Sequence, residues 1–416
     1  MKKMKLQDCC IFISDGDHQA PPKSDKGVPF ITISNITTDN RIDFSNVMYV
    51  PLEYYEQLSE KSKAIKNDIL YSVVGSFGKP VLIEEDRKFV FQRHIAILRP
   101  NLEKVIPEFL YYTLLNPQFY TVADYLAIGA AQRTISLESL RNIEIELPSL
   151  SQQKRIVDVI APIDKKIHEN AMINDYLQRQ IQLLYDYWFT QFNFPGDDGR
   201  PYKATNGLMV WNEKINQIIP ADWQVKPLGA ICSFRNGINY DKNVEGNTVY
   251  KIINVRNISS STLFLDESNF DMICLPQQQG DKYRVSNDSI IIARSGIPGT
   301  TRILYNPSSN IIFCGFIICC TPYDNTLQNY LTLYLRQFEG SSATQTGGSI
   351  LKNVSQETLK NLLVPIPQQS LLSKFNDSVS RIYNLINGNI KENVQLTTLR
   401  DWLLPMLMNG QAIIED

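Results

Sequence analysis

Residues 151–192 read SQQKRIVDVIAPIDKKIHENAMINDYLQRQIQLLYDYWFTQF, a long polar stretch with a regular apolar pattern. The pattern positions recur alternately four and three residues apart, which is the spacing of the buried seam of a supercoiled helix. The seam consists of Ile156, Ile160, Ile163, Ile167, Asn170, Asn174, Leu177, Ile181, Leu184 and Trp188. This stretch therefore predicts one long helix of the coiled-coil type.

A second seam lies 219 residues further along the chain. It consists of Phe375, Val379, Ile382, Ile386, Asn389, Asn393, Leu396, Arg400, Leu403 and Leu407. Both asparagines recur in place, and an asparagine on an apolar seam costs stability while it fixes helix register. We expect two antiparallel helices with a central polar layer, in which Asn170 faces Asn393 and Asn174 faces Asn389. A chance likeness of two amphipathic helices is the alternative, and it is disfavoured because the repeat extends beyond them.

Length and composition indicate a folded protein of two or more domains. The chain has 416 residues, and no apolar run approaches the roughly 20 residues of a membrane span. A cytoplasmic protein is expected, because acidic residues interrupt what would be the apolar core of a signal peptide. Seven cysteines and three histidines show no zinc spacing. The net charge of −2 predicts that any nucleic-acid surface is local or is completed by partner subunits.

The region before the first seam has the pattern of a mixed α/β module. Short β-branched or aromatic runs predict strands at residues 28–32, 69–74, 81–84, 89–98 and 143–147. Helices are predicted at residues 52–63 and 107–115. Pro162 is expected to kink the long helix or to separate a short lead-in helix from it. The glycine-rich and proline-containing segment FPGDDG, residues 194–199, predicts a linker.

The same features return in order after this linker. VKPLGAIC (residues 225–232) resembles KMKLQDCC (residues 3–10), and SIIIARSGIPG (residues 289–299) stands where DILYSVVGSFG (residues 68–78) stood. The sequence therefore predicts a mixed α/β fold of two duplicated modules separated by long antiparallel coiled-coil-like helices, with pseudo-two-fold symmetry. The expected parts are a module at residues 1–148, a helical spacer at 149–193, a linker at 194–220, a second module at 221–366 and a second helical spacer at 367–416.

The motifs of common enzyme classes are absent from the sequence. There is no phosphate-binding GxxxxGK(S/T), no GxGxxG that opens a helix, no HExxH and no GxSxG. The Asn/Asp-Pro-Pro-Tyr/Phe loop that amino-group methyltransferases use is also missing, because Asn116-Pro117 and Asn306-Pro307 lack the second proline and the aromatic residue. The sequence therefore indicates a binding protein and not an enzyme.

Glycine-bearing turns with hydroxyls and cations are the best candidates for DNA contact, because they suit phosphate binding or the reading of guanine by arginine. The candidates are Gly75, Ser76, Gly78 and Lys79 in one module and Arg294, Ser295, Gly296, Thr300 and Arg302 in the other. Second candidates precede the matched short helices, namely Gln132, Arg133 and Lys352. Ordinary hairpin turns and glycine-rich helix entries are the alternative interpretations of these loops.

The chain resembles the specificity subunits of type I restriction-modification systems along its whole length. The resemblance rests on SLRNIEIELPSLSQQKRI (residues 139–156), DYWFTQFNFP (residues 186–195) and LLPMLMNG (residues 403–410). The LPxLxxQxxI signature at residues 147–156 is specific. The second copy, VPIPQQSLL at residues 364–372, lacks the usual glutamine position, which makes a second lead-in helix less certain.

This resemblance implies two target-recognition domains, each reading half of a split double-stranded DNA sequence. It also implies two modification subunits bound at the helices, which carry S-adenosylmethionine and methylate adenine, and restriction subunits that use ATP and Mg for translocation and cleavage. No cofactor or metal is expected in this chain. The alternatives are a self-sufficient DNA methyltransferase and a structural coiled-coil adaptor whose modules bind protein.

Overall fold

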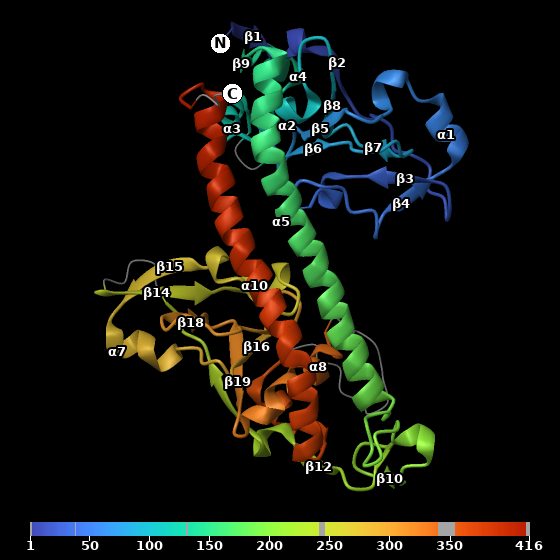
Figure 1. Cartoon of the computed structure of the whole chain (residues 1–416), viewed down its shortest axis with the longest axis vertical. Helices are drawn as coiled ribbons and strands as arrows, with labels where there is room; N and C mark the ends of the chain where they lie inside the picture. Colours follow the sequence, from blue (N-terminus) through green and yellow to red (C-terminus); the bar gives the residue numbers. More distant parts are fainter. Residues whose placement is uncertain (1, 38, 130–131, 241–245, 340–353, 413–416) are drawn as a thin grey trace. The chain divides into compact units, whose positions relative to one another are not determined.

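The computed structural model describes residues 2–37, 39–129, 132–240, 246–339 and 354–412. The chain divides into two compact units, the first formed by Met1–Glu169 with Asn393–Asp416 and the second by Asn170–Glu392. Each unit contains one mixed α/β module, which we name module 1 (residues 2–147) and module 2 (residues 224–366). Both dividing points fall inside long helices, so each unit also holds one segment of each helix (Figure 1).

Module 1 is built on three small sheets. Its strands are β1 (Lys2–Lys5), β2 (Cys10–Asp15), β3 (Val28–Ile31), β4 (Met48–Val50), β5 (Ile69–Ser72), β6 (Pro80–Leu82), β7 (Val90–Phe91), β8 (Ile95–Pro100) and β9 (Glu144–Leu147). The sheet orders are β2-β8-β5-β6, β4-β3-β7 and β1-β9. β3 and β7 pair in parallel, and the other pairs of these strands are antiparallel. The connecting helices are α1 (Leu52–Gln57), α2 (Pro107–Leu115), α3 (Pro117–Leu126) and α4 (Leu137–Asn142).

Module 2 repeats this topology strand for strand. Its strands are β12 (Gln224–Pro227), β13 (Cys232–Asn236), β14 (Thr248–Ile253), β15 (Asp271–Leu275), β16 (Ile290–Ala293), β17 (Thr301–Ile303), β18 (Ile311–Phe313), β19 (Ile317–Pro322) and β20 (Leu363–Ile366). The orders are β13-β19-β16-β17, β15-β14-β18 and β12-β20, with β14 and β18 parallel. Its helices are α6 (Val255–Ser260), α7 (Gln277–Gly280), α8 (Gln328–Arg336) and α9 (Gln356–Asn361). The predicted duplication of the modules is confirmed.

The central strand of each module is buried on both faces, and this explains its unbroken apolar sequence. In β5, Ile69 and Tyr71 pack into one core cluster while Leu70 between them packs into another. Side chains alternate between the faces of a strand, so two cores are separated by a single layer of backbone. β16 repeats the arrangement, with Ile290 and Ile291 in different clusters. Burial of each such side chain contributes about 1.5–3 kcal/mol.

Two long helices carry the predicted seams. Helix α5 spans Leu150–Tyr185 and continues into a π-helical turn at Asp186–Thr190, and helix α10 spans Gln369–Met408 (Figure 1, green and red). Of the two alternatives expected at Pro162, a kink or a separate lead-in helix, the separate helix is wrong, because α5 runs through this proline without a break. Proline removes one backbone donor, and tertiary packing of the flanking turns on the module 1 core offsets that loss: Ile156 and Ile160 are both buried there.

The two helices run antiparallel within each unit. In the first unit, Arg400 of α10 donates to Asp164 of α5 at 2.8 Å. In the second unit, the ring of Trp188 lies 5.7 Å from that of Phe375, close to the start of α10. In each unit, seam residues of both long helices also belong to the hydrophobic core of the module. The helix pair is therefore part of the core of its own unit.

Several local expectations were only partly right. The helix expected at residues 52–63 ends at Gln57, and the strand expected at 89–98 is divided into β7 and β8 by a turn. The segment expected to be a linker at 194–220 contains a hairpin of β10 (Met209–Asn212) and β11 (Gln217–Pro220). Among the described residues, no helix has the length and apolarity needed to cross a membrane.

Candidate nucleic-acid interface

The turn between β5 and β6 carries the first group of expected contact residues. Gly75 and Gly78 have φ angles of 72° and 88°, in the left-handed region that favours glycine. The Gly78 amide donates to the Ser72 carbonyl at 2.9 Å. The Ser72 hydroxyl donates to the Ser76 carbonyl and accepts from the Lys79 amide, each at 2.9 Å. The turn is thus held internally, while Gly75 and Ser76 are exposed.

The turn between β16 and β17 has the same backbone geometry, 221 residues later. Gly296 and Gly299 have φ angles of 77° and 86°, and the Gly299 amide donates to the Ala293 carbonyl at 2.9 Å. Arg294 is exposed and Ser295 is half-buried. Both turns therefore present open backbone next to a polar side chain, which is the arrangement that phosphate contact and base reading require.

In module 1, a second expected loop lies against the first. The Gly75 amide donates to the Arg133 carbonyl at 2.9 Å, and Val74 and Thr134 form an antiparallel bridge. A Cβ atom on Gly75 would lie 3.7 Å from Nε2 of Gln132, whose side chain is exposed. The structure therefore brings two predicted groups, far apart in sequence, to one edge of module 1.

Helix α3, which the sequence did not predict, supports both of these loops. The Arg133 guanidinium donates to the Asp124 carboxylate at 2.8 Å and also to the Asp124 carbonyl. The rings of Phe77 and Tyr120 stack with centroids 5.3 Å apart. Arg133 thus joins its loop to α3, and about two-fifths of its side chain stays exposed.

A neighbouring turn contributes residues that the sequence did not single out. In module 2 the Arg294 amide donates to the Phe316 carbonyl at 2.9 Å, and its guanidinium reaches the Gly315 carbonyl at 3.4 Å. Phe316 is 62% exposed. In module 1 the equivalent bond joins the Val73 amide to the His94 carbonyl at 2.9 Å. Gly315, which interrupts an apolar run, was the one sequence signal for this turn.

A family model for the type I restriction modification DNA specificity domain matches residues 1–179 and, separately, residues 220–396. The chain belongs to this specificity family. It is 22% identical to the type I restriction enzyme HindI specificity subunit of Haemophilus influenzae, over 92% of this chain and 94% of that protein. It is 24% identical to the MjaIX specificity subunit of Methanocaldococcus jannaschii, over 75% and 70%. The crystal structure of the type I system S subunit from M. genitalium shares the fold, with a TM-score of 0.53 and 16% identity over 98% and 96% of the two chains.

The specificity subunits of this family recognise DNA and do not themselves catalyse a reaction. The described cysteines are buried except Cys274, and burial raises the pKa of the Cys9 thiol to about 11. Such a thiol stays protonated at neutral pH and is a poor nucleophile. No group of three or more His, Cys, Asp or Glu side chains with metal-binding geometry occurs in the described part of the chain.

Two residues expected to contact DNA point into module 2 of this specificity protein. Arg302 is 7% exposed, and its guanidinium donates to Glu339 at 2.6 Å and to the Ser261 carbonyl at 2.9 Å. Thr300 is 3% exposed and donates to the Ile297 carbonyl at 2.7 Å. Both side chains stabilise the turn from inside, so we remove them from the candidate interface. Lys352, the second candidate expected in module 2, lies outside the described residues.

The seam asparagines make hydrogen bonds within each unit. In the second unit, the Asn389 amide donates to the Asn174 side chain at 2.8 Å, Asn174 donates to the Ile386 carbonyl at 3.3 Å, and Asn170 donates to the Glu392 carboxylate at 2.7 Å. In the first unit, Asn393 donates to the carbonyl of Ile167 at 3.0 Å. These bonds satisfy polar groups that the apolar seam would otherwise leave unpaired.

Proposed function

We propose that this chain is the non-catalytic subunit that reads the DNA target of a type I restriction-modification complex. Each module reads one half of a gapped double-stranded sequence, and partner subunits methylate adenine and cleave. The single observation that supports this most strongly is the pair of turns at Gly75 to Gly78 and Gly296 to Gly299. Two modules with the same topology present the same backbone shape, but the side chains around it differ. That is what a reader of two different half-sites needs.

The side chains at the two turns offer different contacts. Module 1 presents Lys79 and Gln132 near its turn, and module 2 presents Arg294 with the exposed ring of Phe316. Arginine pairs bidentately with guanine and glutamine with adenine, whereas lysine contacts phosphate or guanine. The proposed interface is therefore local, in agreement with a net charge of only −2 for the chain.

The surface of α5 in the second unit supports the binding of partner subunits. Met172, Tyr176, Leu183 and Tyr187 are 44%, 57%, 67% and 40% exposed. At 100° per residue Met172, Tyr176 and Leu183 lie on one stripe, roughly opposite the seam positions Asn174 and Ile181. Tyr187 lies just beyond α5, in the π-helical turn. A helix that is apolar on two faces indicates a second protein partner. We assign this stripe to one of two modification subunits.

In this proposal the cofactors belong to the partners. Modification subunits hold S-adenosylmethionine, and restriction subunits use ATP and Mg. The asparagines fix the register of the paired helices, and the domain boundaries expected from the sequence define the two readers and their helical spacers. The complex acts in the cytoplasm, where the host DNA is.

The experiment is a DNA-binding titration of the chain reconstituted with its modification subunits. We expect affinity for duplex DNA to fall as salt rises, because phosphate contacts release counterions. Specific duplexes should bind roughly 10³-fold or more tightly than random duplexes. The same titration without modification subunits, together with a test of S-adenosylmethionine binding, is the control. Absence of salt-dependent DNA binding by the complex would favour the adaptor alternative, and turnover by the chain alone would favour the self-sufficient methyltransferase.

A further inference from the structure

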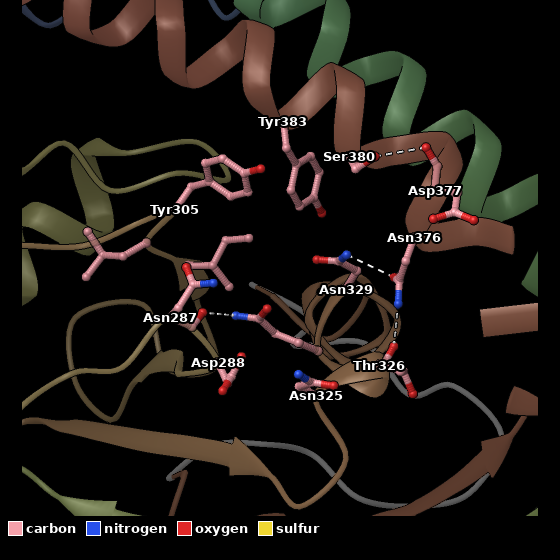
Figure 2. Close-up of a pocket in the computed structure, with 13 residues that line it drawn as sticks. Asn287, Asp288, Tyr305, Asn325, Thr326, Asn329, Asn376, Asp377, Ser380 and Tyr383 are labelled. Carbon is pink, nitrogen blue, oxygen red and sulfur yellow. Dashed lines mark hydrogen bonds between the residues drawn. The ribbon is translucent and has the colours of Figure 1, made fainter. Parts of the chain in front are cut away.

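A polar pocket of about 310 Å³ lies within the second unit, between module 2 and the first half of α10 (Figure 2). Its lining comes from four places: the loop before β16, the end of β17 with the two residues that follow it, the start of α8 with the 3-10 turn that precedes it, and one side of α10. None of these residues belongs to the turns proposed to read DNA. The pocket is therefore a separate feature of the surface.

Three of the five amide side chains that line the pocket use a donor within the protein. Gln328 donates to the Asn287 carbonyl at 2.6 Å, and Asn329 donates to the Asn376 side chain at 2.9 Å. Asn376 in turn donates to the Thr326 carbonyl at 2.9 Å. These bonds turn amide hydrogens toward the walls and fix the side chains in place. These three side chains of the pocket are thus preorganised.

Three acceptors in the lining have no partner among the described residues. The carboxylates of Asp288 and Asp377 make no hydrogen bond or ion pair there, and Figure 2 shows them on opposite sides of the pocket. Between them the hydroxyl of Tyr383 points into the pocket; this side chain is 2% exposed and its oxygen has no hydrogen-bond partner. A buried polar atom without a protein partner is unfavourable, so a donor that enters the pocket and hydrogen-bonds to this oxygen would be stabilised there.

The lining also excludes anions and offers aromatic surface. It contains two carboxylates and no Lys, Arg or His. The rings of Tyr305 and Tyr383 lie edge to face, with centroids 5.9 Å apart. A planar guanidinium has five donors, no acceptor and a flat face that stacks on aromatic rings, whereas an ammonium is a compact point charge. This combination of acceptors and rings matches guanidinium best.

The geometry points to a site for an arginine side chain, presented by a partner polypeptide that docks on module 2 and α10. Asp288 and Asp377 supply the charge, and Tyr383 accepts a hydrogen bond at the base of the pocket. The identification of the partner as a modification subunit rests on the proposed function. The preference of the pocket for a guanidinium group does not depend on that function.

The test uses the full chain alone and acetyl-arginine-methylamide as the probe, with saturation-transfer NMR to detect weak binding. Acetyl-citrulline-methylamide is the matched control, because it has the same shape without the charge. We expect transfer to the arginine side-chain methylenes, and at least about tenfold weaker binding of citrulline. The Asp288→Asn/Asp377→Asn variant should lose the effect and Tyr383→Phe should reduce it, while Asp197→Asn, an exposed carboxylate outside the pocket, should retain it.

Equal transfer to arginine and citrulline would overturn the proposal, as would full binding by a folded Asp288→Asn/Asp377→Asn variant. A thermal melt of each variant shows that it is folded. The identity of the partner is tested separately: the Asp288→Lys/Asp377→Lys variant is titrated with the modification subunit, and their assembly is measured. Unchanged assembly would exclude that subunit as the source of the arginine. Because no DNA is present in the probe experiment, its outcome is independent of whether the chain reads DNA.

Discussion

The side-chain amide of Asn389 donates a hydrogen bond to the side-chain oxygen of Asn174 at 2.8 Å, across the two long helices of the second unit. Asn174 is 8% exposed, so its oxygen has little access to water. The hydrogen-bonded pair therefore costs little stability, whereas replacement of one asparagine leaves the other with an unpaired buried group. We propose that it sets helix register, as a polar residue on an apolar seam does elsewhere.

This pair gives a prediction about stability. Asn389→Leu should destabilise the second unit by about 1–3 kcal/mol, because Asn174 is left with an unpaired buried oxygen. Asn174→Leu/Asn389→Leu should be less destabilised than the sum of the single changes, with a coupling of about 0.5–3 kcal/mol. Urea unfolding measures this, with Gln180→Leu on the exposed side of α5 as the control. Simple additivity would show that the two asparagines do not act as a pair.

The ion pair between Arg302 and Glu339 gives a second prediction. Glu339 accepts from both the Arg302 guanidinium and the Thr301 amide, at 2.6 and 2.9 Å. Glu339→Gln should destabilise the second unit by about 2–3 kcal/mol, less than the roughly 3–5 kcal/mol for a fully buried pair because Glu339 is partly exposed.

Replacement of both partners separates the charge from the packing. Arg302→Met/Glu339→Met should recover much of the loss, because an apolar pair of similar volume is often as stable as a buried ion pair. Glu213→Gln, at an exposed position, is the control for loss of a carboxylate. If Glu339→Gln unfolds at the same urea concentration as the parent chain, the pair does not support the β16–β17 turn.

The glycines of the module 1 turn give a third prediction. Gly78 has a φ of 88°, and a Cβ atom there would lie 2.6 Å from the ring of Tyr120. Gly199 has a φ of 77° with nothing within 4 Å of such an atom. Gly199→Ala should therefore cost only the strain of the left-handed backbone, about 1–2 kcal/mol.

Gly78→Ala should cost more, because strain and the collision with Tyr120 add. Thermal melting of the two variants measures the difference. Measured against the Tyr120→Ala variant, the further change Gly78→Ala should cost about as much as Gly199→Ala costs in the parent chain. Equal effects of the two single substitutions would mean that Tyr120 moves aside freely and does not support the turn.

Much of the fold followed from the sequence because local pattern and tertiary packing agree. Strand β5 and helix α2 were predicted closely, since a buried apolar run and a proline at the first helical turn specify them. A separate lead-in helix, one of the two alternatives expected at Pro162, was wrong, because packing of the helix on module 1 outweighs the lost hydrogen bond. Helix α3 was missed because it follows α2 directly, with Asn116 as the N-cap between them.

The candidate site was less predictable, because a sequence shows which side chains occur and not where they point. Arg294 follows β16 and Arg302 lies in β17, and the two look equivalent in the sequence. Arg294 is exposed, whereas Arg302 is 7% exposed and donates to Glu339. The exposure of Phe316 could not be predicted from the sequence, because an aromatic residue between two apolar runs has the pattern of a strand. The packing and register of the strands decide which arginine faces solvent, and register is a tertiary property.

The fourth prediction concerns the division of reading between the modules. Arg294→Ala should weaken recognition of one half-site only, by roughly 1–3 kcal/mol at one base position if the guanidinium pairs with guanine. A phosphate contact would instead weaken all sequences and lower the salt slope by about one. Lys79→Ala is the matched variant in module 1 and should leave the half-site of module 2 unchanged. Loss at both half-sites from either substitution would contradict separate readers.

Methylome sequencing of cells that carry this chain and its modification subunits tests the central claim most directly. The proposal predicts methylated adenines in a single motif of two specific parts separated by an unspecific gap, and no such motif when this chain is deleted. Exchange of module 2 for that of another specificity protein should change one part and keep the other. A continuous ungapped motif, or a methylation pattern that does not depend on this chain, would contradict the account.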